Sequence, residues 1–160
     1  MTKPNYFQSR VSQGKMNEKF YKSIIEENIK ENLNICKGLY SLFDFENENF
    51  MIELKTREVE RFKYPTTIIG YDKILKGLKY LEDNKRVIFY FGFKTDGLFK
   101  FELNDDNYKD FKVSKIGCRF RNSLKEHLEI PVDILEFVCC ETPIQSDYSE
   151  RVRHLKGWSQ

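Results

Sequence analysis

Three charged residues, Asp44, Glu53 and Lys55, lie on either side of a short polar segment, Glu46–Asn49. The polar segment has the composition of a tight turn, and apolar residues flank it, so the sequence predicts a β-hairpin. Because side chains alternate between the two faces of a strand, Glu53 and Lys55 should lie on the same face. An acid and a lysine side by side, with a second acid across the hairpin, are groups that could hold a cation and activate water.

The register of the hairpin decides whether Asp44 joins this face. We expect Phe45 to pair with Phe50 and Asp44 with Met51, which leaves Asp44 diagonal to Glu53 with roughly 7–8 Å between the Cα atoms. Two carboxylates at that separation can reach one cation, and hard oxygen ligands favour Mg²⁺ or Mn²⁺. The lysine on the same strand face would then lie beside the metal ion.

This arrangement resembles the PD-(D/E)XK nuclease superfamily, which has the restriction-endonuclease-like fold. The signature of the superfamily is an Asp, a short hairpin and then an acid-x-Lys on the next strand, and the similarity covers roughly residues 14–93. The family often reads hydrophobic-Glu-hydrophobic-Lys-Thr/Ser-Arg, and Ile52–Arg57 has this pattern, IELKTR. Phe43 stands in place of the proline of the motif, a departure that many members share.

The resemblance implies an α/β fold with a central mixed β-sheet flanked by helices and an αβββαβ core. We expect a single domain over residues 1–160, with the core at about 14–103 and C-terminal strands and a tail at 104–160. The implied activity is Mg²⁺- or Mn²⁺-dependent hydrolysis of phosphodiester bonds. Asp44, Glu53 and the Leu54 carbonyl would bind the metal ion, and Lys55 would orient or deprotonate the attacking water.

A helix before the hairpin is expected to add a third acid. Apolar residues at three- and four-residue steps predict this helix over about residues 17–33. Many members of the superfamily carry a glutamate near the start of the first helix, often shortly after a glycine, and Glu18 follows Gly14 here. Glu18 would hold a second metal ion or its waters, with Glu26 as the reserve candidate. Alternatively, Glu18 is a first-turn glutamate that the helix dipole favours.

Beyond the hairpin, the hydrophobic pattern continues as helix, strand, turn and strand. A second apolar stripe predicts a helix over about 71–81, and a nearly continuous apolar run predicts a buried strand, so the connection should be a parallel crossover. The remaining expected elements are a strand at 87–93, a turn at 94–97, a strand at 98–103, two more strands at 115–121 and 126–132, a short helix at 131–137 and a polar terminus from 139.

Basic and hydroxyl side chains follow the predicted acid-x-Lys strand. Such side chains are the usual phosphate contacts, although a solvated linker and helix face would look the same. The net charge of +2 is too small for bulk electrostatic coating of nucleic acid. The predicted contacts are Arg57, Lys73, Arg61, Lys63, Thr66 and Thr67, and Arg119 and Arg121 could extend them.

DNA is expected as the partner rather than RNA, because an influenza-type RNA endonuclease of the same superfamily uses a histidine ligand near the helix and no histidine precedes His127. No apolar run is long enough for a membrane span and residues 1–12 lack the apolar centre of a signal peptide, so an intracellular location is expected, in the cytoplasm, in the nucleus of a host cell or in a virion. A homodimer is possible. The absence of alanine and the excess of lysine suggest an AT-rich genome, that of a bacterium, a protist or a large DNA virus, of which the virus is preferred.

Three functions therefore compete. The first is a DNA nuclease that acts in repair, recombination or viral genome processing. The second is a noncatalytic nucleic-acid-binding or structural member of the same fold, for example a virion or packaging component. The third is an unrelated small α/β interaction module, in which Glu53 and Lys55 are only a salt pair on an edge strand. The four cysteines include no C-x-x-C pair, so they do not suggest a zinc site.

Overall fold

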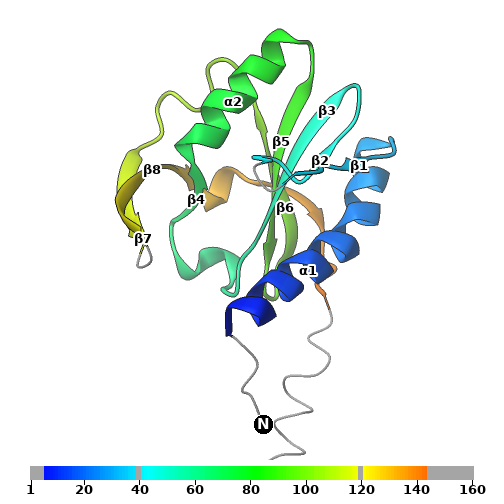
Figure 1. Ribbon diagram of the computed structural model, residues 1–160, viewed down its shortest axis with the longest axis horizontal. Coiled ribbons are helices and arrows are strands. Elements are labelled where there is room, and N and C mark those ends of the chain that lie inside the picture. The colour runs from blue at the N-terminus through cyan, green and yellow to red at the C-terminus, as the bar shows by residue number, and fades with distance from the viewer. Residues whose placement is uncertain (1–5, 39–40, 119–120, 144–160) are drawn as a thin grey trace, which may run out of the picture.

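Two β-sheets and two α-helices make up the fold in the part of the chain that the structure describes (Figure 1). The computed structural model describes residues 6–38, 41–118 and 121–143. Helix α1 spans Tyr6–Ile29 and helix α2 spans Tyr71–Glu82. The six-stranded sheet has the order β1 (Asn34–Ile35), β2 (Phe45–Glu46), β3 (Phe50–Thr56), β5 (Arg86–Phe93), β6 (Gly97–Leu103) and β9 (Glu136–Cys139). A three-stranded sheet has the order β4 (Thr66–Gly70), β8 (Arg121–Pro131) and β7 (Val113–Cys118).

The six-stranded sheet is mixed, as the sequence predicts. Strands β3 and β5 run parallel and are joined through α2, while β2 pairs antiparallel with β3 and β6 pairs antiparallel with β5. All residues of β5 after Arg86 are buried, which explains the nearly continuous apolar run VIFYFGF. The expected α/β class and the parallel crossover are therefore confirmed. The structure adds β4, which the sequence did not predict.

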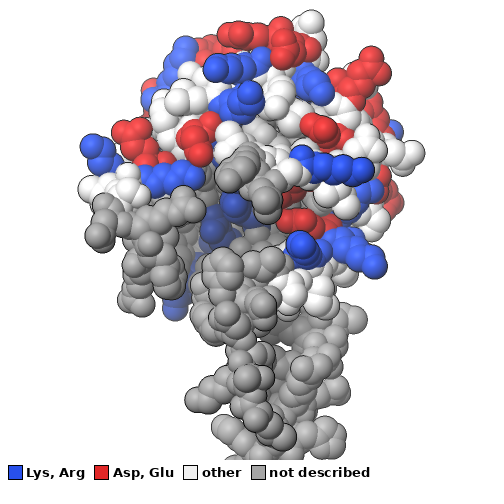
Figure 2. Space-filling view, viewed as in Figure 1, with Lys and Arg blue, Asp and Glu red and all other residues white. Residues whose placement is uncertain are grey.

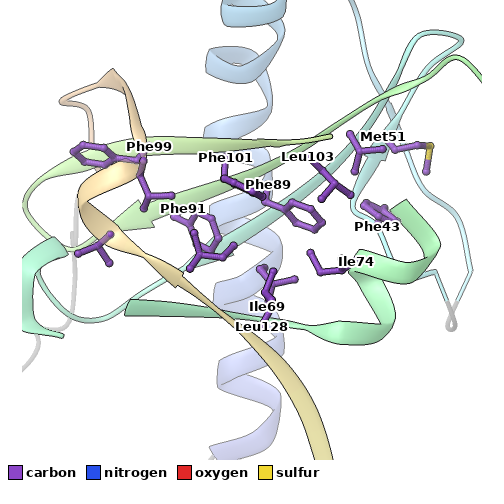
Figure 3. Close-up of a cluster of buried hydrophobic side chains, with 14 of the residues drawn as sticks. Phe43, Met51, Ile69, Ile74, Phe89, Phe91, Phe99, Phe101, Leu103 and Leu128 are labelled. Carbon is purple, nitrogen blue, oxygen red and sulfur yellow. The ribbon is translucent and has the colours of Figure 1, made fainter. Parts of the chain in front are cut away.

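Each face of the six-stranded sheet has its own hydrophobic core. Helix α1 covers one face, where Tyr21 and Ile25 pack with Ile52 and Tyr90. Helix α2 and the three-stranded sheet cover the other face, and Figure 3 shows this second core. Its labelled side chains are Phe43, Met51, Ile69, Ile74, Phe89, Phe91, Phe99, Phe101, Leu103 and Leu128.

Helix α1 differs from the helix predicted at 17–33, because it begins at Tyr6 and ends at Ile29. Gly14, read as a mark of the helix start, lies inside it. The helix ends where Lys30 adopts a left-handed backbone with φ 59°. Beyond this point Glu26 Oε2 accepts a hydrogen bond of 2.8 Å from the Leu33 amide, which ties the apolar Leu33 side chain to the core without continuing the helix.

The hairpin register also differs from the expected one. Phe45 pairs with Ile52 and Glu46 with Met51, rather than Phe45 with Phe50. Asn47 causes the shift, because its side-chain oxygen accepts hydrogen bonds from the amides of Asn49 (2.8 Å) and Phe50 (2.7 Å) and so tightens the turn. The slip is by two residues, and an even slip leaves every side chain on its expected face.

The C-terminal part is only partly as predicted. Strands β7 and β8 correspond to the two expected strands, but a single 3-10 turn (Val132–Ile134) and strand β9 replace the expected short helix at 131–137. Strand β9 pairs with β6 at the edge of the six-stranded sheet. The segment from 144 onward lies outside the described residues. Among the described helices, neither has the length and hydrophobicity that crossing a membrane would require.

Candidate active site

The site lies at the N-terminal end of strand β2. Strand β3 extends beyond this end, so one side of β3 has no strand partner there. The Asp44 amide donates a hydrogen bond of 3.0 Å to the Ile52 carbonyl, and Asp44 Oδ2 then accepts one of 2.7 Å from the Leu54 amide. A carboxylate thus replaces the next backbone partner in the ladder. Because the amide and carbonyl of one strand residue point to the same side, the Leu54 carbonyl faces the same edge as the Asp44 side chain.

Glu53 interacts electrostatically with Asp44 and is almost completely buried, with 1% of its surface exposed. Its Oε1 accepts an ion-pair contact of 2.8 Å from Lys55 Nζ and a second, very close one from Lys73 Nζ. Its Oε2 is buried and has no hydrogen-bond partner. A buried carboxylate oxygen has lost its hydration, and without a hydrogen-bond partner this cost is not compensated. The atom is therefore suited to bind a cation, or a water molecule that a cation holds.

Glu18 brings a third carboxyl to the site from helix α1, although this helix covers the opposite face of the sheet. Burial raises the pKa of Glu18, and the charge of Glu53 raises it further, while a hydrogen bond with Asp44 opposes the rise. The neighbouring Asn17 donates a hydrogen bond of 3.2 Å to Thr56 Oγ1, which fixes this turn of α1 at the end of β3. The reserve candidate Glu26 instead pairs with Lys22 at 3.3 Å and binds the Leu33 amide.

The surroundings of Asp44 disfavour its charged form. Burial, followed by the charge of Glu53, raises the pKa of Asp44 to about 7. A divalent cation between these carboxyls would favour their charged forms. The described side chains contain no group of three or more His, Cys, Asp or Glu that could hold a metal ion by themselves. The expected ligand set needs only two carboxylates, Asp44 and Glu53, and the Leu54 carbonyl, and these residues fit the donor chemistry of Mg²⁺ or Mn²⁺.

The two lysines at Glu53 differ in their surroundings. Lys55 has 35% of its side chain exposed and Lys73 has 15%. For Lys55, burial is the largest influence and lowers the pKa, but the charge and hydrogen bond of Glu53 outweigh it and the pKa is raised. Burial lowers the pKa of Lys73, and the charge of Glu53 offsets only part of this decrease. The raised pKa keeps Lys55 positively charged, and the Lys73 ammonium is the more buried of the two.

Most of the predicted phosphate contacts bind the protein itself. Arg57 donates to the Ile68 carbonyl (2.5 Å) and Thr67 Oγ1 (3.3 Å) and so links β3 to β4. Arg61 donates to the Val132 carbonyl at 2.8 Å and lies over the Phe99 ring. Thr66 Oγ1 donates to Glu129 at 3.4 Å.

Lys63 is the exposed member of the predicted set. The side chains of Arg119 and Arg121 lie outside the described residues. In the space-filling view, Lys or Arg side chains lie in a recess near acidic ones, and both charges are interspersed on the surrounding face (Figure 2).

Lys73 is the functional residue whose place the sequence did not reveal. It was expected to contact phosphate from one turn into the second helix, but it contacts Glu53. One signal was present in the sequence. The first turn of a helix carries a partial positive charge that disfavours a lysine, and a lysine at the third position of α2 therefore calls for a nearby anion.

Comparison of the chain with protein-family models, curated proteins and solved structures finds no match. The arrangement of the site residues is therefore the basis for any functional assignment.

Proposed function

We propose that this protein is a metal-dependent nuclease that hydrolyses phosphodiester bonds in DNA, in repair, recombination or viral genome processing. One observation carries the proposal: a buried Glu53 with an unpartnered oxygen faces Asp44 at the open edge of β3, and Lys55 lies 2.8 Å from the same carboxylate. These are the groups and the strand placement that the resemblance to the PD-(D/E)XK superfamily implies. The order of elements, α1, three strands, α2 and β5 with β4 added, supports it as well.

Each residue has a defined task in this proposal. Asp44 and Glu53, with the Leu54 carbonyl, would hold Mg²⁺ or Mn²⁺, and the ion supplies charge neutralisation and a more acidic water. Lys55 orients the attacking water and offsets the negative charge that develops on the phosphate. Glu18, which interacts with both Asp44 and Glu53, would hold a second metal ion or its waters. DNA is favoured over RNA because His127 and His154, the two histidines, both follow the site in sequence and neither is among the expected ligands.

A noncatalytic role competes with this proposal on one specific observation. Both lysines pair with Glu53 Oε1, which is also how a buried structural ion-pair network would look. In that case the cluster would join α2 to β3 and the protein would bind nucleic acid or other virion components without cleaving it. The two functions differ in what the loss of Lys55 would do.

Cleavage assays on a supercoiled plasmid and a single-stranded oligonucleotide, with Mn²⁺, Mg²⁺ or EDTA, test the proposal. Lys55→Ala should keep the fold and the DNA affinity but lose about 100-fold or more in single-turnover rate, since it removes transition-state stabilisation. Lys79→Ala, an exposed lysine on α2, is the matched control and should cleave at the wild-type rate. A wild-type protein that is inert with every metal and both substrates would refute the catalytic function.

A further inference from the structure

The charge around Glu53 is already balanced without a metal ion. Lys55 and Lys73 both pair with Glu53 Oε1, and the Arg57 guanidinium also interacts with the charge of Glu53. These three cations face three carboxyls, because Glu18 and Asp44 interact electrostatically with Glu53. Lys15 also interacts electrostatically with Glu18, so in the ionised forms the positive charges at least match the negative ones.

A divalent ion that enters this cluster alone would leave an uncompensated charge of at least +2. Glu53 is buried and Lys73 has only 15% of its side chain exposed, and unit charges a few ångströms apart interact strongly in such surroundings. The lysine ammoniums would repel the metal ion, while the unpartnered Glu53 Oε2 would attract it. Phosphodiester groups, each with one negative charge, would restore the balance if they bound at the same time.

We infer that the protein binds its divalent metal ion tightly only together with a phosphodiester, and that Lys73 creates this dependence as a positioning residue that holds charge on Glu53. The inference rests on the proposed function and names a property of the same site. Lys73 suits this role because its contact atom is the carboxylate oxygen that Lys55 also uses, and because 15% exposure keeps it out of bulk water. It reaches Glu53 from the first turn of α2, so the charge is placed by a helix rather than by a loop.

The coupling must be reciprocal. If DNA raises the affinity for Mn²⁺, then Mn²⁺ raises the affinity for DNA by the same factor. Removal of the Lys73 charge should therefore have two opposite effects on metal binding. Mn²⁺ alone should bind more tightly, because one repelling charge is gone, and the gain caused by DNA should shrink.

Calorimetric titration of the full chain with Mn²⁺, near pH 8, tests the inference. The titration is done without DNA and with a short duplex whose phosphorothioate linkages keep their charge but resist cleavage. Wild-type protein should bind Mn²⁺ at least roughly tenfold more tightly with the duplex than without it. Lys73→Met should bind Mn²⁺ alone roughly tenfold more tightly than wild type and show a smaller gain with the duplex. Lys73→Arg, which keeps the charge, and Lys79→Met, on the same helix, should both behave like wild type.

The outcomes separate this inference from the proposed function. If wild-type protein binds Mn²⁺ and DNA but with no mutual effect, or if Lys73→Met equals Lys79→Met, the inference is wrong and the nuclease proposal stands. If wild-type protein binds neither Mn²⁺ nor DNA in any combination, both are wrong. The wild-type titrations decide the coupling even if a thermal melt shows that Lys73→Met does not fold.

Discussion

Asp44 is the residue whose ionisation should control stability against pH. Burial, followed by the charge of Glu53, raises its pKa from 3.8 to about 7. Between these pH values the folded protein keeps a proton that the unfolded chain releases, so the free energy of unfolding falls as pH rises and the loss is complete above about pH 7. Asp44→Asn has no charge to bury and still offers an oxygen to the Leu54 amide. Urea denaturation should show this variant about 2–4 kcal/mol more stable than wild type near pH 8 and equal to it near pH 4.

Asp105→Asn is the control for this prediction, because Asp105 is exposed and lies far along the chain from the site. It should leave the pH profile of wild type unchanged. A pH-dependent decline of equal size in wild type and Asp44→Asn would mean that another group controls it.

At the scale of single residues, the sequence indicated on which face of a strand a side chain lies, but not which side chain of another element it contacts. Strand alternation alone placed Glu53 and Lys55 together, and the two-residue error in register did not move Asp44 to the wrong face. Lys73 was different, because the direction in which a helix side chain points depends on how the helix is rotated against the sheet. That rotation is fixed by packing between distant residues.

The packing of α2 against the sheet is close enough to make Gly77 a sensitive position. A Cβ added there would lie 2.9 Å from Leu103 Cδ2 and 3.1 Å from Val87 Cγ1. Replacement of glycine within a helix gains about 1 kcal/mol at most in propensity, whereas overpacking costs about 1–3 kcal/mol. Gly77→Val adds three carbons, so overpacking should win and the free energy of unfolding should fall by about 2 kcal/mol.

Urea denaturation measures this effect, with Lys76→Val as the control at an exposed position of the same helix. The control changes helix propensity and removes the contact of Lys76 Nζ with the Tyr80 ring, 5.3 Å from its centroid, but leaves the packing against the sheet, so it should cost about 1 kcal/mol or less. Equal losses in the two variants would show that α2 tolerates a larger side chain against the sheet. Because Lys73 lies on the same helix, a displaced α2 would also weaken its contact with Glu53.

Among the elements, those with long regular patterns were predicted and those with short or interrupted patterns were not. The apolar run of β5 and the stripe of α2 gave both elements correctly to within a few residues. Strand β4 has five residues, and its partner β8 lies far along the chain, so its hydroxyls were read as phosphate contacts. In α1 a mid-helix glycine was taken for the helix start, because the apolar stripe is weak before it.

The whole molecule carries a net charge of +2, and three of the predicted phosphate contacts, Arg57, Arg61 and Lys73, are engaged in internal contacts. Affinity for DNA should therefore depend on few phosphate contacts and fall only shallowly with salt. Lys63→Ala, at an exposed lysine, should reduce the slope of log affinity against log salt by about one unit. Binding titrations at several salt concentrations measure the slope.

Arg57→Met is the contrasting variant, since Arg57 donates to the Ile68 carbonyl inside the protein. It should leave the salt slope unchanged and instead destabilise the fold by about 1–3 kcal/mol, because the carbonyl loses a charged donor. Equal salt slopes for wild type and Lys63→Ala would remove Lys63 from the proposed DNA-binding surface.

Strand β2, which has only two residues, limits how the hairpin can vary in length. The Leu54 amide is free to bind Asp44 only because β2 ends before it, and the Leu54 carbonyl faces the same gap. If β2 were extended toward residue 42 in regular pairing, its backbone would satisfy both groups of Leu54, and the edge that admits a cation would close. Lengthening β2 would add hydrogen bonds to the sheet and stabilise it, so a gain in stability at this edge would come at the expense of the site.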